Sequence, residues 1–553
     1  MQVENLYKQY CKETFDERGV LKTFESVVPG DFNFAYDVVD KIAELEPARR
    51  AMVWCNEAGE ERAFTFSEMS AYASRAANLF SSMGVEKGDM VMLVLKRHYQ
   101  FWFAVLGLHK LGAVGVPATN LLTTKDYVYR FNAAGVKHVV CTAEGEVTAR
   151  VEQACAEYAG IQNKLVARGR RDGWTDFDAE IEKQPDSFAR VPTSSSDMLL
   201  LYFTSGTTGH PKMVYHEHSY PMAHIITAKY WHNVDPGGLH LTVSETGWMK
   251  SVWGKLYGQW ILGAGIFVYD FDKFVPRELL ARIARHQVTT FCAPPTIYRF
   301  FIKEDTESFN FSSVKHATTA GEALNPEVYT RFQELTGLQL MEAFGQTETT
   351  VLTVNLVGTT PKPGSMGKPS PLYNVLLVDE NGETVPPGEV GELVVKVPEQ
   401  GRQNGLFSGY HKDEALTKTV WHDGMYHTGD TAWMDEDGYF WYVGRTDDII
   451  KASGYRIGPF EIESVLMEHP AVLECAVTGA PDPVRGTVVK ATVVLTQAYE
   501  PSNELRKELQ DYVKKQTAPY KYPRILDFVS ELPKTISGKI KRRVIRSGGK
   551  DDE

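Results

Sequence analysis

Up to about residue 360 the chain alternates continuous apolar runs with amphipathic stretches, and this alternation limits the folds open to it. The apolar runs lie at 90–95, 138–142, 198–203 and 267–270, with helix-like segments between them. Strands that are apolar throughout are typical of parallel sheets covered by helices. The sequence therefore predicts an α/β fold for this part of the chain.

The pattern changes after about residue 365. Asn381-Gly382 stands between two strand-like runs and is a hairpin signal, and further strand-like runs follow up to residue 445, so we expect a β-barrel-like subdomain there. Beyond it, apolar residues recur at helical spacing in a stripe of Leu505, Leu509, Tyr512 and Val513, next to two strand-like runs. We predict an N-terminal domain over 1–446 and a small α+β C-terminal domain over 447–553.

Composition excludes several classes of function. The 553 residues carry 59 Lys and Arg against 71 Asp and Glu, a net charge of −12, which does not suit a nucleic-acid coat. The longest apolar stretches fall well short of the 18 or so residues that span a membrane, and the charged, aromatic start lacks the apolar core of a signal peptide. Six cysteines form no CxxC pair. We therefore expect a cytoplasmic protein with reduced thiols.

One loop has the composition of a phosphate-binding site. It follows the apolar run 198–203 and contains Thr204, Ser205, Gly206, Thr207, Thr208, Gly209 and Lys212. Its glycines allow a tight turn and a close approach to an anion, its hydroxyls and successive N–H groups are donors, and its lysine adds a positive charge. The Walker A pattern is absent, and so is a helix-opening GxGxxG. The sequence therefore predicts a polyphosphate-binding loop that differs from both of these types.

The loop TSGTTGHPK resembles the signature of the adenylate-forming enzymes, which include acyl-CoA synthetases, luciferases and peptide-synthetase adenylation domains. Four further segments agree in order and spacing: GEAL (321–324), FGQTET (344–349), YHTGD (426–430) and GYFWYVGRTDDIIKASGYRIGPFEIE (438–463), with PKTISGKIKRR (533–543) after them. SETGWMKSVWGKLYGQWILGA, CAPPTIYR and APYKYPR are most similar to medium-chain acyl-CoA synthetases.

The resemblance implies two half-reactions. A carboxylic acid and ATP give an acyl-adenylate and pyrophosphate, and the thiol of CoA then displaces AMP. The implied partners are therefore a small carboxylic acid, ATP with Mg²⁺, and CoA as co-substrate; a homodimer is a weaker expectation from the family. An adenylation enzyme that loads a carrier protein and a non-catalytic nucleotide-binding homologue remain as alternatives.

The matching positions carry implied roles at the nucleotide. Thr347 would contact the α-phosphate, and Glu348 would hold Mg²⁺, which prefers one or two carboxylates beside phosphate oxygens. Asp430 would accept hydrogen bonds from the ribose, with Arg445 beside it. The residues expected to line the adenine are Gly321, Glu322, Ala323, Glu342 and Phe344. Taken alone, Asp430 also fits an ordinary turn and Phe344 a core aromatic.

The resemblance assigns the last hundred residues to catalysis and movement. Lys539 would reach the α-phosphate and the attacking carboxylate as the adenylation catalyst, although alone it could be one cation of a solvated basic segment. Arg456 would reach the phosphate region, and Gly454 would let the pantetheine arm pass. Asp447 would be the hinge that turns a mobile C-terminal domain between the two half-reactions.

The acyl pocket is predicted from one position at which this sequence differs from acetate-specific relatives. Acetate-specific relatives have a tryptophan at the position of Gly345, so its absence opens space for a longer or branched acid. The other expected pocket residues are Trp231, Trp248, Trp253, Lys250 and Cys292; plain core packing is the alternative for the tryptophans. Several indoles would limit the depth, which favours short branched to medium-chain acids.

Overall fold

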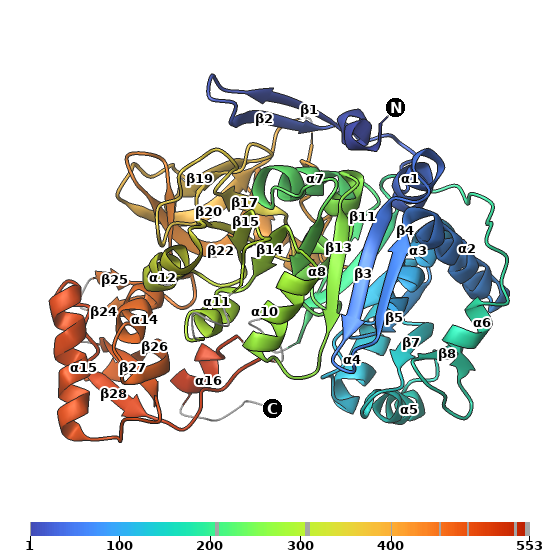
Figure 1. Ribbon diagram of the computed structural model, residues 1–553. Coiled ribbons are helices and arrows are strands. Elements are labelled where there is room, and N and C mark those ends of the chain that lie inside the picture. Colours follow the sequence, from blue (N-terminus) through green and yellow to red (C-terminus); the bar gives the residue numbers. More distant parts are fainter. Residues whose placement is uncertain are drawn as a thin grey trace.

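The computed structural model describes residues 2–204, 210–304, 310–399, 401–452, 455–483, 486–535 and 539–547, apart from the side chain of Arg456. A large body holds two mainly parallel sheets and a third, antiparallel one, and a small lobe lies beside the body at its C-terminal end (Figure 1). An N-terminal hairpin, β1 (Cys11–Phe15) and β2 (Leu21–Ser26), lies along the top edge of the body in the view of Figure 1.

The first sheet has seven described strands, of which only β11 runs antiparallel to its neighbour. In spatial order they are β11 (Lys212–Glu217), β10 (Met198–Thr204), β6 (Val114–Pro117), β5 (Met90–Val94), β7 (His138–Thr142), β8 (Asn163–Ala167) and β9 (Thr175–Asp176). The predicted strands at 90–95, 138–142 and 198–203 are confirmed as β5, β7 and β10. All residues of β5 and β7 are buried, which explains their continuous apolar character.

The second sheet has nine described strands, with a parallel centre and antiparallel edges. Their order is β18 (Lys368–Pro369), β17 (Val351–Val354), β16 (Leu340–Gly345), β15 (His316–Thr319), β14 (Thr290–Ala293), β12 (Leu239–Thr242), β13 (Gly265–Asp270), β3 (Arg50–Asn56) and β4 (Glu61–Thr65). The predicted strand at 267–270 is part of β13.

Helices connect and cover these sheets. In the body they are η1 (Val3–Gln9), η2 (Ala35–Asp40), α1 (Lys41–Leu45), α2 (Phe66–Ser82), α3 (Gln100–Leu111), α4 (Thr124–Ala134), α5 (Val147–Glu157), α6 (Phe177–Ile181), α7 (Tyr220–Ile225), η3 (Ile226–Trp231), α8 (Lys250–Gly254), α9 (Tyr257–Ile261), α10 (Pro276–Arg285), α11 (Pro295–Phe301), α12 (Pro326–Thr336) and α13 (Glu414–Val420). Local sequence sets their starts: Thr65 and Glu68 form a capping box on α2, and Pro276 stands at the first turn of α10.

The predicted β-barrel-like subdomain is an antiparallel sheet that stays open over its described strands. It consists of β19 (Asn374–Val378), β20 (Val390–Lys396), β22 (Met425–Met434) and β21 (Trp421–His422), with β23 (Phe440–Arg445) also paired to β22. Asn381-Gly382 does form a tight turn, with Gly382 at φ +81°, but only a single bridge joins Val378 to Thr384 across it. β19 pairs with β20 instead, because this gives five paired residues and buries the apolar face.

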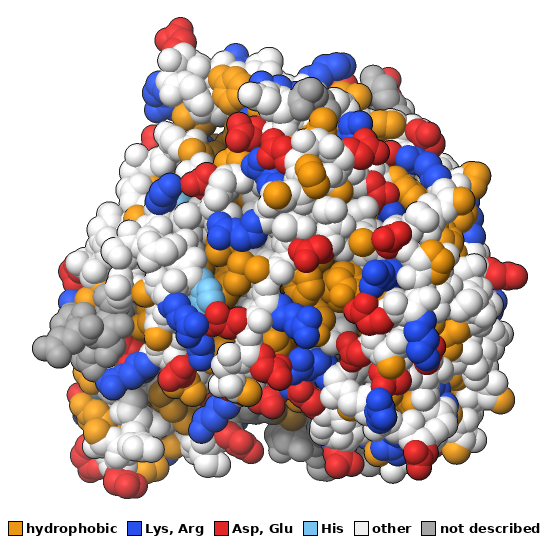
Figure 2. Space-filling model, turned by 45° about the vertical axis from the view of Figure 1, so that its right-hand side comes forward, with side chains coloured by type: hydrophobic (Ala, Val, Ile, Leu, Met, Phe, Trp, Pro, Cys, Tyr) orange, Lys and Arg blue, Asp and Glu red, His pale blue; other side chains and the backbone are white. Residues whose placement is uncertain are grey.

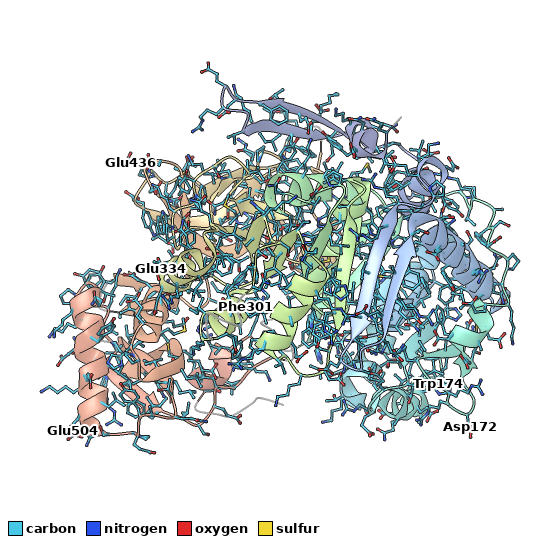
Figure 3. All side chains as sticks on the ribbon, in the orientation of Figure 1. Asp172, Trp174, Phe301, Glu334, Glu436 and Glu504 are labelled. Carbon is cyan, nitrogen blue, oxygen red and sulfur yellow. The ribbon has the colours of Figure 1, made fainter. Side chains whose placement is uncertain are left out.

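The small lobe is α+β, as expected. It contains β24 (Ile450–Ala452), β25 (Tyr455–Ile457), α14 (Pro459–Met467), β26 (Val472–Asp482), β27 (Gly486–Leu495), α15 (Asn503–Gln516), β28 (Ile525–Phe528) and α16 (Arg542–Arg546). In α15 the buried residues are Leu505, Leu509 and Val513, three of the four predicted stripe positions. Figure 3 places Glu504, at the start of α15, on the outer edge of the lobe, and Glu436, beyond β22, on the outer edge of the third sheet.

The lobe contacts the body through few described groups. The Asn325 amide donates to the Ser464 carbonyl at 3.2 Å, the Arg299 guanidinium lies 3.4 Å from the Met467 sulfur, and the rings of Tyr442 and Phe460 lie 5.9 Å apart. Such limited contact suits a domain that changes position. The boundary at 446/447 stays a prediction.

Candidate active site

Sheet register brings the predicted ribose acid and its cation together. Asp430 of β22 is directly opposite Arg445 of β23, and the guanidinium lies 3.2 Å from the carboxylate. Facing residues of an antiparallel pair interact across the sheet, so the YHTGD and GRTDD segments form one charge pair. The carboxyl of Asp430 is buried, and burial raises its pKa; the positive charges of Arg445 and Lys539 oppose that rise.

Two further side chains hold Asp430 from either side. The Tyr442 hydroxyl donates to one carboxylate oxygen at 3.1 Å, and the Gln346 amide donates to the other. Gln346 is held in turn by the Tyr426 hydroxyl, which donates to its carbonyl oxygen at 2.7 Å. This network links the QTE and YHTGD segments through side chains, and it fixes the direction in which Asp430 can accept hydrogen bonds from a ligand.

The predicted metal ligand occupies a second cluster. Glu348 follows β16 and accepts a hydrogen bond from the Tyr410 hydroxyl at 3.1 Å. The ammonium of Lys212 lies 5.0 Å from the centre of the Tyr410 ring. Burial raises the pKa of Glu348, and the charges of Lys212 and Arg445 oppose this. Burial also lowers the pKa of Lys212. A single partly buried carboxylate next to a lysine fits Mg²⁺ carried by a polyphosphate, since Mg²⁺ needs few protein ligands.

The predicted phosphate loop connects two antiparallel strands. Thr204 ends β10 and pairs with Lys212, the first residue of β11. This differs from the strand-to-helix connection of a Walker A loop and accounts for the absence of that pattern. Ser205, Gly206, Thr207, Thr208 and Gly209 lie outside the described residues. Thr347 lies in the turn between β16 and β17, where its carbonyl contacts the His216 ring at 2.7 Å.

The segment predicted to line the adenine is organised by Glu342. This glutamate is buried, and one carboxylate oxygen accepts the Leu324 N–H at 3.1 Å, which fixes the end of the GEAL loop. Gly321 and Glu322 are exposed, Ala323 and Phe344 are half-buried, and the Phe344 ring lies 6.2 Å from that of Tyr442. Glu342 therefore supports the loop from behind. Its second carboxylate oxygen is buried and has no partner among the described groups.

The lobe presents Lys539 toward this site. Lys539 is exposed, its N–H donates to the Thr535 hydroxyl at 3.1 Å, and its charge acts on the pKa of Asp430. At the predicted hinge, the Asp447 carbonyl accepts from Arg546 at 2.9 Å, and its carboxylate lies 3.7 Å from Arg445. Gly454 and the side chain of Arg456 lie outside the described part of the chain, so their predicted roles are not placed.

The structure brings together only part of the predicted acyl pocket. Trp253 is buried and donates to the Tyr220 hydroxyl at 3.2 Å. A Cβ added at Gly345 would lie 2.6 Å from the Trp253 ring and 2.4 Å from the Thr350 carbonyl. Trp253 therefore lies directly against Gly345, and the acid length that this arrangement admits stays a prediction.

Lys250 and Cys292 form a second group. The Lys250 ammonium donates to the Ala320 carbonyl at 2.6 Å, just before the GEAL loop. Burial lowers the pKa of Lys250, and nearby Cys292 opposes this. Trp248 is half-buried just before α8, whereas Trp231 is fully buried and donates to the Met341 carbonyl at 2.9 Å. Core packing, the alternative for the tryptophans, thus describes the surroundings of Trp231.

Sequence reasoning missed Gln346, Tyr410 and Tyr442, which hold the two predicted carboxylates. Gln346 stands within the quoted FGQTET segment and Tyr442 within GYFWYVG, so proximity to a motif was the available signal. Tyr410 lies in none of the quoted motifs, so the sequence offered no signal for it. Reasoning also missed a buried polar region behind Trp253: His224 lies 6.1 Å from that indole, ring centre to ring centre, and neither of its nitrogens has a partner among the described residues.

Comparison with known proteins decides the family. The model of the AMP-binding enzyme family matches residues 39–411, and that of the AMP-binding enzyme C-terminal domain matches residues 461–539. This chain belongs to the AMP-binding enzyme family. It is 39% identical to acyl-coenzyme A synthetase ACSM3, mitochondrial, of Mus musculus, over 98% of this chain and 95% of that one. To acyl-coenzyme A synthetase ACSM4, mitochondrial, of Homo sapiens it is 41% identical, over 94% and 91%.

Solved structures agree with this assignment. The anthranilate CoA ligase AuaEII in complex with anthranoyl-AMP superposes with a TM-score of 0.86 at 29% identity, covering 94% of this chain and 98% of that one. A benzoate CoA ligase from Burkholderia xenovorans gives 0.81 at 28% identity, covering 93% and 100%. The predicted family, the two-domain α/β fold and the acid:CoA ligase activity through an acyl-adenylate are confirmed.

One expectation is wrong. The curated relatives named above are mitochondrial, which contradicts the predicted cytoplasmic location. The composition on which that expectation rested cannot separate two compartments that both keep thiols reduced. All six cysteines are free, and no described helix is both long and apolar enough to cross a bilayer. Figure 2 shows acidic and basic side chains intermixed over the face in view.

Proposed function

We propose that this acyl-CoA synthetase activates short branched to medium-chain carboxylic acids with MgATP and CoA. The observation that carries the proposal is the convergence on one site of the Asp430–Arg445 pair, the Glu348–Tyr410–Lys212 cluster and the charge of Lys539. An acyl pocket closed by Trp253 beside Gly345 supports the limit on acid length.

In the first half-reaction a carboxylate oxygen of the acid bonds to the α-phosphorus of ATP, and the bond to the pyrophosphate oxygen breaks. Lys539 supplies positive charge at the α-phosphate, where negative charge accumulates. Lys212 and the hydroxyls of the 204–209 loop bind the leaving pyrophosphate, and Asp430 orients the ribose. Glu348 would hold Mg²⁺, whose charge neutralises the phosphates when it is bound.

In the second half-reaction the sulfur of CoA bonds to the acyl carbonyl carbon, and the bond to the AMP phosphate oxygen breaks. Gly454 serves this step by letting the pantetheine arm pass after the lobe turns about Asp447, and Arg456 reaches the phosphate region in one of the two arrangements. The contacts seen between lobe and body are few, and the Arg546–Asp447 bond joins α16 to the hinge so that both turn together.

The test is a panel of straight and branched acids of two to ten carbons, incubated with ATP and Mg²⁺, with and without CoA. Acyl-CoA, AMP and pyrophosphate are measured by mass spectrometry. We expect the rate of thioester formation to be highest with branched or medium-chain acids. A maximum at acetate would contradict the acid preference. AMP formation without any thioester would favour an adenylation enzyme that serves a carrier protein.

A further inference from the structure

The β21–β22 hairpin carries two histidines whose rings are stacked. Asp423 and Gly424 form its two-residue turn, with φ of +51° and +70°, the backbone of a tight β-hairpin. His422 pairs with Met425, so His427, two residues further along β22, lies on the same face of the sheet. The two imidazole rings are 3.8 Å apart and 13° from parallel.

Each imidazole has a carboxylate at its Nδ1 atom. The Asp423 carboxylate lies 2.8 Å from His422 Nδ1, and the Glu392 carboxylate lies 3.1 Å from His427 Nδ1. An Nδ1–H that donates to a carboxylate leaves the lone pair on Nε2, as in metal-binding histidines. His427 Nε2 is buried and has no partner within the described part of the chain. The hydrogen bond at Nδ1 therefore fixes the ring, while Nε2 has no described protein group to bind.

We propose that His422, Asp423 and His427 form a binding site for a divalent transition metal ion of the zinc type, separate from the Mg²⁺ of the nucleotide. One ligand atom from each residue lies within 4.8 Å of those of the other two. Two imidazoles and a carboxylate suit Zn²⁺, Ni²⁺ or Cu²⁺, whereas Mg²⁺ prefers oxygen ligands. The His422 and Asp423 side chains are 44% and 79% exposed, so they can adjust around an ion and water can complete its coordination.

The position of the site gives the ion a structural role. It would join the turn, β21 and β22, and Glu392 connects His427 to β20. The same glutamate accepts the Gly429 N–H at 3.1 Å, and Gly429 precedes Asp430. An ion at this site therefore rigidifies the strand that carries the ribose acid. The amides of residues 425–429 should exchange more slowly with solvent when the ion is bound.

The test uses the full-length, chelator-treated protein without nucleotide. Zn²⁺ binding is measured by calorimetry, stoichiometry by native mass spectrometry, and ligand geometry by the visible spectrum of bound Co²⁺. We expect one ion that is lost in the H422Q/H427Q double variant. Asp423→Asn removes a proposed carboxylate ligand and should weaken binding by at least about 10–100-fold, the loss typical of an outer-shell partner alone, and it keeps the turn because asparagine tolerates positive φ. His411→Gln is the matched control, since His411 Nε2 is also buried without a partner but belongs to no such group.

Three outcomes would overturn the proposal. The first is wild-type protein that binds no more Zn²⁺ than the double variant. The second is a Zn²⁺ ion that saturating MgATP displaces equally from wild type and double variant, which would assign it to the nucleotide site. The third is an unchanged exchange rate of residues 425–429 with a stoichiometric ion bound. Circular dichroism of each variant checks that it is folded, and Asp423→Asn keeps the test decisive if the double variant is not.

Discussion

The proposed nucleotide end and the proposed acyl end of the active site are built in different ways. Asp430 accepts hydrogen bonds from Arg445, Tyr442 and Gln346, so its position is set by directed bonds along a strand register. At the acyl end the Trp253 indole makes one hydrogen bond, to the Tyr220 hydroxyl, and the rest of its ring is held by packing, with Gly345 against it. The first end should therefore respond to loss of charge or of a donor, and the second to changes of volume.

The largest effect should come from removing Lys539, the cation that we assign to the adenylation step. In Lys539→Ala we expect acyl-adenylate formation to fall by at least about 10²–10³-fold, because charge at the transferring phosphate is no longer neutralised. Thioester formation from supplied acyl-adenylate and CoA should be preserved. Lys541→Ala, which removes a neighbouring exposed lysine, is the control. Equal losses in both half-reactions would show that Lys539 acts on the fold instead.

Loss of the ribose acid should rank second. Asp430→Asn removes the charge that Arg445 and Tyr442 face, and a charge-assisted hydrogen bond contributes about 1.5–3 kcal/mol. We expect kcat/KM for ATP to fall about 10–100-fold, with the acid-length profile unchanged. Asp437→Asn, an exposed acid of the same sheet region, should leave both unchanged. A shifted length profile in Asp430→Asn would mean that the two ends are coupled.

The acyl end should respond to volume. Trp253→Ala should move the preferred acid toward longer chains, by up to about fourfold in kcat/KM for each methylene, since a buried methylene contributes about 0.8 kcal/mol. Gly345→Ala should lower kcat/KM for every acid, because its Cβ has no room beside Trp253 and Thr350. In the double variant the two effects should not add. Unchanged profiles in both single variants would remove these residues from the pocket.

The smallest effect concerns stability. Burial raises the folded-state pKa of Glu348 above 4.5, so its ionised form opposes folding. This destabilisation is absent below pH 4.5 and grows as the pH rises through the folded-state pKa. Glu348→Gln should therefore raise the melting temperature at pH 8 by about 1–3 °C. The difference from wild type should shrink as the pH falls toward 4.5; a difference that is constant with pH would contradict this origin.

Sequence alone predicted the buried strands and helices, because β5, β7 and α15 show their burial in apolar periodicity. The family resemblance also named Asp430 and Arg445, which the structure pairs, while their role at the ribose stays a prediction. It could not predict that Tyr410 approaches Glu348, since 62 residues separate them and no local pattern marks the contact. The tryptophans show the same limit: Trp231 and Trp253 look alike in sequence and both are buried in the core, but only the ring of Trp253 lies against Gly345 among the described contacts. The Asn381-Gly382 signal gave the turn, while strand pairing was decided by burial.

The contact between Gly345 and the Trp253 ring also bears on how this family can diverge. A side chain at position 345 fits only after residue 253 has become smaller and the Thr350 carbonyl has shifted. The substitution at 253 would therefore have to precede the one at 345. A bulky residue introduced first at 345 would collide with the Trp253 ring and the Thr350 carbonyl. Descendants of this sequence would reach a pocket for smaller acids through intermediates that accept larger ones.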